Sequence, residues 1–555
     1  MVEGGPIDVL TGDWLAELTM LILARSQAKR NGGGYARTFV AQMERVMGSC
    51  LDRGIKVVSN AGGLDPDGCA AAVAAVADKL GLAPTIATVT GDNLLAREEE
   101  MGLRHFETGE PIEDVDRFIS ANAYVGGWGI AEALKMGADI VVTGRATDAA
   151  VVCGPAAWHH GWAADDWDQL AGAIVAGHVI ECGTQATGGN YSFFTEIDGL
   201  RRAGFPWAEI SADGSSTIGK HDKTGGAVDI GTVTSQLLYE IGGPAYLNPD
   251  VTSRFDTIEL DQVGDDRVRI HGTKGEPPPP TLKVALNELG GYRQDIALAL
   301  VGLDIEAKAA LIEDAFWEAL GSGPASFDEV TIGLDRTDKA DPGSNAEAVA
   351  AWRLTIKDRD ETKLGRPISD TLNELGLATI PGFFGLGGGG SRPYGVYTPA
   401  LIDAAAVPQY VAILGGNRTV VDSTSPTGTG TVTATPGPQA QMPEGETRPV
   451  PLGTIIGARS GDKGGDANLG VFARTDAAWA WLDAYLTVEE LKALLPEAAD
   501  LVVERHVLAS IRSLNFVIKG LLQEGVAAST RQDGQAKSLG EWLRARVVDV
   551  PVELL

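Results

Sequence analysis

Short apolar runs that stop at a polar turn recur through the N-terminal part of the chain. The tripeptides TGD (11–13), TGD (90–92) and TGR (143–145) each follow such a run, and stretches with helical spacing of apolar side chains lie between them. Strands that alternate with helices in this way predict βαβ units, whose parallel strands are buried on both faces. We therefore expect an α/β domain over residues 1–245, built on a doubly wound, mainly parallel sheet.

Polar residues that follow the apolar runs are expected to meet at one edge of this sheet. Ligands bind outside the carboxyl ends of parallel strands, and glycine at these positions lets backbone amides approach a ligand closely. The predicted ligand-binding residues of this rim are Asn60, Gly62, Gly63, Asp92, Asn93, Asn122, Gly126 and Gly127. Turns and helix caps need the same residue types, so a purely structural role is an equal alternative at any one position.

Residues 151–194 contain three of the seven histidines and two of the four cysteines. His178 and Cys182 are four residues apart, but neither HExxH nor CxxC accompanies them, so a structural role is favoured over a metal site. Glu181 lies between them and is a candidate acid or base if it is buried. The segment ATGGNY then offers a carbonyl or phosphate oxygen the residues Gly188, Gly189 and Asn190, or it is an ordinary turn.

From about residue 246 the pattern changes to that of an α+β lobe, which we expect to extend to residue 421. The sequence GxGxxG from Gly385 to Gly390 follows no clear strand, and Pro393 prevents an immediate helix, so it does not predict a dinucleotide site. We expect a mobile loop here, near the site, with Arg392 available for an anionic ligand.

A stretch rich in Pro, Gly, Thr and Ser predicts a linker over residues 422–449. The remaining residues, 450–555, have the pattern of four strands and two or three helices, which predicts a small α+β domain. Its polar loop contains the candidate ligand-binding residues Asp462, Lys463 and Asn468. An interdomain contact or a self-neutralising turn would explain the same loop.

The charge balance argues against several classes of partner. The chain has 75 acidic and 45 basic residues, a net charge of -30, whereas nonspecific nucleic-acid binding needs a basic face. Its apolar stretches fall short of the roughly 20 residues that a membrane helix needs, and its start does not resemble a signal peptide. The four cysteines form no paired motif. We expect a cytoplasmic protein with neither nucleic acid nor membrane as a partner.

Six segments together resemble the acyclic terpene utilisation family AtuA, whose longer members carry a ferredoxin-like C-terminal domain. The resemblance covers nearly the whole chain. The segments are SNAGGLDP (59–66), GDNL (91–94), SANAYVGGWGIAEAL (120–134), GADIVVTGRATDAA (137–150), ATGGNY (186–191) and ARSGDKGGDANLGV (458–471). Family members usually open with a Gly-rich strand and loop ahead of the segment that matches IDVLTGDWLAELTM. Since this sequence starts at that segment, we expect that the first βα unit is missing or that the start codon is placed late.

The resemblance implies catabolism of branched or terpenoid acids as CoA thioesters, alongside a biotin-dependent acyl-CoA carboxylase. We expect an enzyme with lyase or hydratase chemistry on a hydroxyacyl-CoA, in which CoA enters as part of the substrate, and a homo-oligomer. The alternatives are a non-catalytic accessory or scaffold subunit of the carboxylase pathway and an acyl-CoA-binding module.

Arg145 and Asp148 are the charged pair for which such chemistry suggests a role. Removal of water or cleavage of a carbon–carbon bond beside a thioester needs a base and fixed donors for an enolate-like oxygen. Asp148 is the predicted base and Arg145 the partner of the carboxylate or oxyanion, with Asn60 and the amides of Gly62 and Gly63 as donors. Asp13 and Asp92 could instead hold Mg²⁺, although no cofactor is certain. A structural i,i+3 ion pair explains Arg145 and Asp148 equally well.

Overall fold

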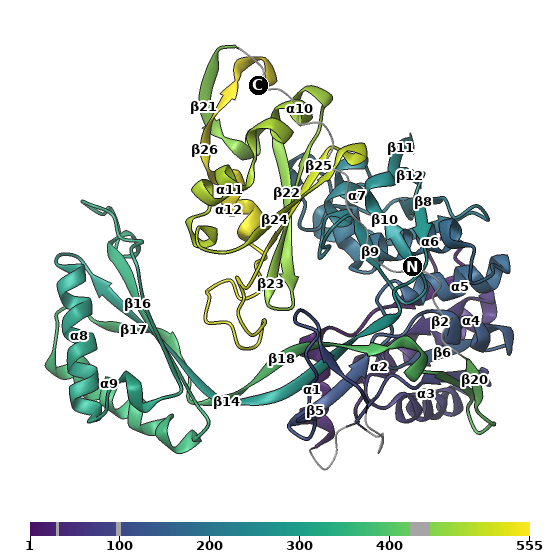
Figure 1. Cartoon of the computed structure of the whole chain (residues 1–555), viewed down its shortest axis with the longest axis horizontal. Helices are drawn as coiled ribbons and strands as arrows, with labels where there is room; N and C mark the ends of the chain where they lie inside the picture. The colour runs from purple at the N-terminus through teal and green to yellow at the C-terminus, as the bar shows by residue number, and fades with distance from the viewer. Residues whose placement is uncertain (29–32, 96–100, 422–444) are drawn as a thin grey trace. The chain divides into compact units, whose positions relative to one another are not determined.

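The computed structural model describes residues 1–28, 33–95, 101–421 and 445–555. These residues form two compact units (Figure 1). Unit 1 comprises Met1–Asn287, Tyr397–Val526 and Asp533–Leu555, and unit 2 comprises Glu288–Val396 and Ala527–Gln532. Unit 2 is narrower than the lobe expected over 246–421, and residues 450–555 pack largely within unit 1. Most of the expected linker, residues 422–444, lies outside the described residues.

Unit 1 contains a six-stranded sheet in the order β1-β2-β6-β3-β19-β20. The first four strands in this order are parallel, and the last two pair antiparallel. The strands are β1 (Val9–Gly12), β2 (Lys56–Ser59), β6 (Ile140–Thr143), β3 (Ile86–Thr90), β19 (Gln409–Ile413) and β20 (Thr419–Val421). The TGD and TGR turns of the sequence therefore lie at or just after the carboxyl ends of three parallel strands.

Helices cover both faces of this sheet. Successive side chains of a strand point to opposite faces. Val57 accordingly packs into one apolar cluster with Met43 and Val73, whereas Val58 packs into another with Ile130 and Val151. The helices involved are α2 (Arg37–Arg53) and α3 (Pro66–Leu80) on the first face, and α4 (Trp128–Lys135) and α5 (Ala150–His160) on the second. A further helix, α1 (Glu17–Gln27), follows β1.

The fourth polar-ended run of the sequence does not join the parallel sheet. It forms β5 (Phe118–Ala123), which pairs with β14 (Thr281–Val301) in a separate seven-stranded sheet. Its end nevertheless reaches the rim of the parallel sheet, because Asn122 forms an isolated antiparallel bridge with Asn93. The other strands of this second sheet are β15 (Glu329–Asp335), β16 (Val349–Asp358), β18 (Arg392–Asp403), β4 (Arg104–His105) and β17 (Phe384–Gly388).

Two small antiparallel sheets complete the N-terminal part of unit 1. They pack with helices α6 (Trp167–Ile180) and α7 (Ile230–Leu237) around Val175, Ile218, Val233 and Phe255. Their strands are β11 (Glu259–Gly264), β12 (Arg267–His271), β8 (Ser216–Lys220) and β7 (Pro206–Ile210), and β13 (Lys274–Glu276), β10 (Thr252–Arg254) and β9 (Ala245–Leu247).

Unit 2 packs helices α8 (Ile305–Leu320) and α9 (Arg366–Ala378) around a core that includes Trp352 and Phe316. The prediction of a loop at Gly385–Gly390 is wrong, because residues 384–388 form β17 and pair with β14. Arg392 is the first residue of β18. Glycine has no side chain whose alternation could reveal a strand, so the backbone pairing left no periodic signal in the sequence.

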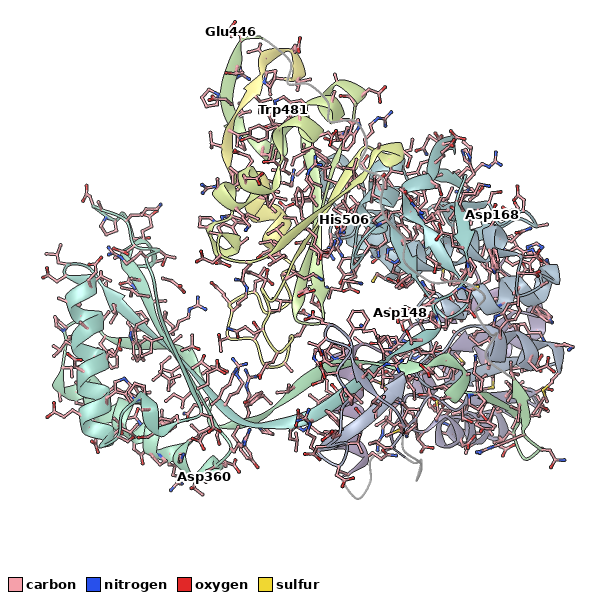
Figure 2. The ribbon with its side chains drawn as sticks, viewed as in Figure 1. Asp148, Asp168, Asp360, Glu446, Trp481 and His506 are labelled. Carbon is pink, nitrogen blue, oxygen red and sulfur yellow. The ribbon has the colours of Figure 1, made fainter. Side chains whose placement is uncertain are left out.

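The C-terminal residues form the expected α+β domain around Trp481, Leu469, Phe516 and Leu543 (Figure 2). Its antiparallel sheet has the order β22-β23-β25-β24. The sheet consists of β22 (Ile456–Lys463), β23 (Asp466–Ala473), β25 (Ser513–Ile518) and β24 (Val503–Leu508). The helices are α10 (Asp476–Tyr485), α11 (Val488–Leu494) and α12 (Leu539–Ala545), and a second pairing joins β21 (Thr447–Pro451) to β26 (Val547–Pro551).

In the described part of the chain, no helix combines the length and the apolar character needed to cross a bilayer.

Candidate functional site

Arg145 connects the polar turns that follow three strands of unit 1. Its backbone amide donates to Asp92 Oδ2 (2.8 Å) after β3, and its carbonyl accepts from the amide of Val125 (3.1 Å) after β5. Its side chain donates from Nη1 to the carbonyl of Leu15 (2.7 Å) after β1. Arg145 follows the apolar strand β6 (Ile140–Thr143) and holds three separate loops in place.

Asp148, labelled in Figure 2, forms an ion pair with Arg145. Asp148 Oδ1 lies 2.9 Å from Arg145 Nη1. The guanidinium is almost completely buried and lies over the ring of Tyr124, with its Cζ 4.2 Å from the ring centroid. The i,i+3 ion pair considered from the sequence is therefore present. Arg145 is held on several sides, and its positive charge stays at the rim.

Asp13 is a buried carboxyl at the same rim whose pKa is raised. It accepts a hydrogen bond of 2.5 Å from Asn60 Nδ2, and Asn60 Oδ1 in turn accepts from the amide of Trp14 (2.8 Å). Burial and the negative charge of Asp148 raise the pKa of Asp13 to about 7, against the lowering effects of Arg145 and Asn60. A carboxyl with this pKa can both accept and release a proton near neutral pH.

Glu181 is a second buried carboxyl whose pKa is altered by its neighbours. Asp13, Asp148, Glu181 and Glu240 are called the carboxyl cluster below. Its side chain is 5% exposed, and Oε1 lies 3.5 Å from Nδ1 of His178. Burial, followed by the charges of Asp148, Asp13 and Glu240, raises the pKa of Glu181 well above its usual range. Burial also lowers the pKa of His178 to about 4. Burial therefore favours the uncharged form of both side chains.

Glu240 belongs to this cluster through its charge and is positioned by the C-terminal domain. Its backbone has φ of +55°, a left-handed conformation that costs energy in a residue other than glycine. Its amide donates to Asn468 Oδ1 (2.8 Å), and its carbonyl accepts from Lys463 Nζ (3.2 Å). Asn515 Nδ2 donates to the next two carbonyl groups, at 3.2 and 2.5 Å.

The predicted polar loop of the C-terminal domain is mostly strand, because Asp462 and Lys463 end β22 and Asn468 lies on β23. These residues contact the turn at Glu240. Besides the contacts of Lys463 and Asn468, Asp462 lies 3.9 Å from Lys537 Nζ, which is also 3.6 Å from the Glu240 carboxylate. The interdomain alternative accounts for these contacts. The loop therefore supplies side chains that hold a member of the carboxyl cluster.

Asp92 and Asn122 lie close together but have internal partners. Asp92 Oδ2 accepts from Asn122 Nδ2 (2.7 Å) as well as from the amide of Arg145, while Asp13 faces Asn60. Asn93 Oδ1 accepts from the amide of Leu95 (3.1 Å). Within the described ranges, no group of three or more His, Cys, Asp or Glu side chains has an arrangement that could hold a metal ion.

Several of the predicted glycines form internal hydrogen bonds or lie where a side chain would not fit. The amide of Gly127 donates to both oxygens of the buried Asp250 (3.0 and 2.9 Å), and a Cβ at Gly126 would lie 2.2 Å from Asp250 Oδ1. A Cβ at Gly62 would lie 2.5 Å from the Thr143 carbonyl. The amide of Gly63 donates to the carbonyl of Asn60 (3.2 Å).

The remaining predicted residues lie outside the carboxyl cluster. The amides of Gly188 and Gly189 donate to the carbonyls of Gln185 (3.4 Å) and Thr184 (2.9 Å), and Asn190 is exposed. Arg392 belongs to unit 2, where it pairs with Asp295 (2.8 Å).

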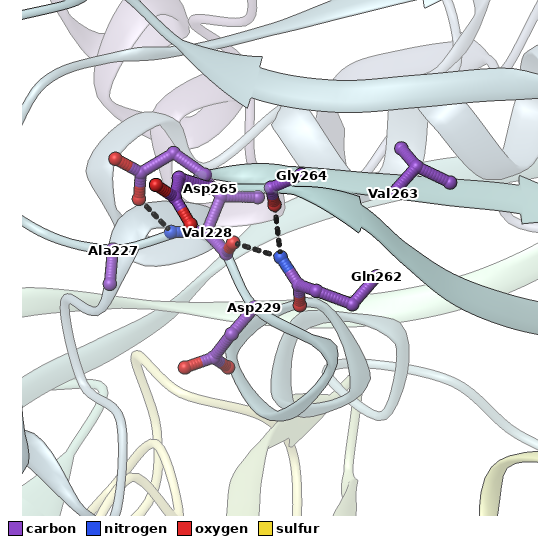
Figure 3. A pocket seen from close by; sticks show the side chains of 8 residues that line it. Ala227, Val228, Asp229, Gln262, Val263, Gly264 and Asp265 are labelled. Atoms are coloured by element: carbon purple, nitrogen blue, oxygen red, sulfur yellow. Dashed lines mark hydrogen bonds between the residues drawn. The ribbon is translucent and has the colours of Figure 1, made fainter.

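A shallow acidic pocket lies elsewhere in unit 1 (Figure 3). It has a volume of about 600 Å³, and its lining includes Asp229, Asp265 and Asp266. Asp229 caps α7, and Asp266 pairs with Lys220 (2.8 Å) and accepts from the amide of Val228 (2.9 Å). Asp229 and Asp266 therefore have structural roles already.

Several residues of the site region were missed from the sequence, among them Glu240 and Arg459. Glu240 lies in an unremarkable turn, and Arg459 directly precedes the loop that contains Asp462. Arg459 Nη2 donates to Gln185 Oε1 across a separation of 274 residues. The one sequence signal near Arg459 was the charged, glycine-rich segment that follows it.

The family relationship agrees with the resemblance of the sequence motifs. The family model described as acyclic terpene utilisation family protein AtuA matches residues 1–413. The model of the AtuA ferredoxin-like domain matches residues 450–549. Searches of curated proteins and of solved structures returned no match. The resemblance is thereby confirmed: the chain belongs to the AtuA family of acyclic terpene utilisation proteins and carries the ferredoxin-like domain of that family.

Proposed function

We propose that this protein is a catabolic enzyme that acts on a branched or terpenoid hydroxyacyl-CoA by lyase or hydratase chemistry. The family points to the use of acyclic terpenes. The sequence resemblance implies branched or terpenoid acids as CoA thioesters. The observation that carries the chemical part is the carboxyl pair next to Arg145. Burial and neighbouring negative charge raise the pKa of Asp13 to about 7 and that of Glu181 well above its usual range.

In such a pair, one carboxyl can act as a base and the other as an acid. In a dehydration, the ionised Asp13 takes a proton from the carbon next to the thioester carbonyl. Glu181 gives its proton to the departing hydroxyl group, which leaves as water. Two carboxyls with different protonation states are a known way to combine acid and base in one site.

Arg145 and Asp148 have a supporting role in this proposal. Asp148, the base predicted from the sequence, pairs with Arg145, so Asp13 takes over the role of base. The positive charge of Arg145 lowers the pKa of both Asp13 and Glu181 and keeps them from rising further. Arg145 also holds the carbonyl of Leu15, two residues after Asp13. Both residues are therefore positioning residues.

The test is turnover of a 3-hydroxy-3-methylacyl-CoA by the purified full chain, followed by the absorbance of the enoyl thioester. The pH profile of kcat/KM should show an acidic limb near pH 7, because the ionised form of Asp13 is the active one. Asp13→Asn and Glu181→Gln should each lower kcat by about 100-fold or more. The matched control is Glu209→Gln, which alters an exposed carboxyl on β7.

A profile without that limb, or an unchanged kcat in Asp13→Asn, would contradict this assignment. Absence of turnover together with co-purification with an acyl-CoA carboxylase would favour an accessory subunit instead. Mg²⁺ remains a proposal that the same assay addresses, since added chelator should lower turnover if the ion takes part.

A further inference from the structure

Five lysine and arginine residues are buried within the described ranges, and four of them pair with a carboxylate. The pairs are Arg145–Asp148 (2.9 Å), Lys220–Asp266 (2.8 Å), Arg293–Asp295 (2.6 Å) and Lys357–Glu329 (2.7 Å). Arg459 is the exception, since it forms no ion pair with any described carboxylate. A buried charge without a counterion is costly, so this side chain needs an explanation.

Arg459 lies on β22 of the ferredoxin-like domain and is 6% exposed. Its two close neighbours are neutral. Nη2 donates to Gln185 Oε1, and the guanidinium lies over the ring of Tyr239, with its Cζ 4.1 Å from the ring centroid. A guanidinium has five N–H donors in a planar fork, so most of its donors have no partner among these neighbours.

A second cation stands over the same ring. Lys537 Nζ lies 4.5 Å from the centroid of Tyr239, and its side chain is partly exposed. Two positive side chains on one aromatic ring repel each other unless negative charge lies close to both. Glu240 and Asp462 lie 3.6 and 3.9 Å from Lys537 Nζ and balance its charge, whereas Arg459 forms no ion pair with a described carboxylate.

The surroundings of Arg459 continue into the carboxyl cluster. Glu240 directly follows Tyr239 in the chain, and its carboxylate lies 3.6 Å from Lys537 Nζ. Arg459 is thus connected to Glu240, a member of the carboxyl cluster, through Tyr239 and Lys537.

We propose that Arg459, with Gln185 and Lys537 beside it, is the binding site for an oxyanion of the ligand, either a carboxylate or a phosphate group. The fork of a guanidinium matches both groups in a bidentate way. That this ligand is also the substrate rests on the proposed function. The site gives the ferredoxin-like domain a direct part in recognition.

The test is binding of three probes to the full chain: glutarate, pyrophosphate and CoA. Melting temperature and isothermal calorimetry report binding, because a ligand of the folded state raises its melting point. Glutarate alone would identify the site with a carboxylate, and pyrophosphate and CoA would identify it with a phosphate. In either case Arg459→Gln should weaken binding by about tenfold or more, since charge-assisted bonds are lost.

Arg474→Gln is the matched control, because it removes one positive charge from the same domain at an exposed position paired with Glu196. It should bind the probes as the unaltered chain does. Without probe, Arg459→Gln should melt no lower than the unaltered chain, since it removes a buried charge that has no partner. If it fails to fold, Arg459→Lys keeps the charge but loses the fork and should bind several-fold more weakly.

Binding of all probes unchanged in Arg459→Gln, or no binding by the unaltered chain, would overturn the site. Asp13→Asn separates this proposal from the proposed function. If it abolishes turnover and still binds the probe, both stand. If no thioester is turned over but probe binding depends on Arg459, the oxyanion site stands and the enzymatic proposal fails.

Discussion

The side-chain amide of Asn60 is one of the groups that determine the pKa of Asp13. Asn60 is completely buried, and it connects Asp13 to the backbone of Trp14 through its two polar atoms. A donor to a carboxylate favours the charged form, so Asn60 lowers the pKa that burial raises. The unusual pKa of Asp13 is thus a balance in which burial and Asp148 raise it and Arg145 and Asn60 lower it.

Asn60→Leu should therefore raise the pKa of Asp13 further. The acidic limb of the pH profile of kcat/KM should move to higher pH, and the free energy of unfolding should fall by about 1–3 kcal/mol, because the Trp14 amide loses its acceptor. Turnover across pH and urea unfolding measure the two effects. Asn93→Leu, at a partly exposed rim position, is the control and should leave the limb in place.

Arg145 should be the most important rim residue for stability. Arg145→Met leaves the Leu15 carbonyl and Asp148 without their partner and should lower the free energy of unfolding by about 3–5 kcal/mol. Chemical denaturation measures this. Lys79→Met, which breaks an exposed pair with Glu44, should cost less than about 1 kcal/mol. Equal losses in the two variants would show that the rim does not depend on Arg145.

At the scale of elements, residues of two strands that lie far along the chain hydrogen-bond to the turn after α7. Asn468 of β23 and Asn515 of β25 hold the left-handed turn at Glu240. The backbone strain at Glu240 is therefore offset by hydrogen bonds from another part of unit 1. The position keeps a carboxylate where a glycine would fit more easily.

Two substitutions at this turn should separate strain from charge. Glu240→Gly and Glu240→Gln both remove the carboxylate, but only glycine relieves the left-handed backbone. We expect Glu240→Gly to be more stable than Glu240→Gln by about 1 kcal/mol, measured by urea unfolding. Both should lower the pKa of Glu181, since the charge of Glu240 raises it. A glutamine variant as stable as the glycine variant would contradict the strain.

The elements near the rim were the most predictable from the sequence. The TGD and TGR turns mark the ends of β1, β3 and β6, because buried strands and their polar turns are adjacent along the chain. The pair Arg145–Asp148 was foreseeable for the same reason. By contrast, the contact of Asn468 with Glu240 spans 228 residues, so no local spacing could indicate it. Helix α2 was not anticipated, and glycine-rich β17 was mistaken for a loop.

At the scale of the whole molecule, buried carboxyls shape the response of stability to pH. Burial raises the pKa of Asp13 to about 7 and that of Asp250 to about 6, above the ordinary value of an aspartate of about 4. Between about pH 4 and these values the folded chain binds more protons than the unfolded chain. Stability therefore falls as pH rises through this window. His178 acts in the opposite direction, because its pKa is lowered.

Asp250→Asn should remove one part of this pH dependence. Asparagine keeps an acceptor for the amide of Gly127 but no longer ionises. Relative to the unaltered chain, the variant should gain melting temperature as pH rises from about 4 to about 6 and show no further gain above that. Asp222→Asn, at an exposed position, corrects for the change in net charge. A difference that does not vary with pH would contradict the raised pKa.

The path of the chain through β14 and β18 also bears on how such a protein could have been assembled. The strand that leads into unit 2 and the strand that returns from it are neighbours in one sheet, and unit 1 ends at Asn287 and resumes at Tyr397. An insertion between two neighbouring strands of a sheet would give this connectivity. A variant in which a short turn joins the two strands directly would test whether unit 1 folds without unit 2.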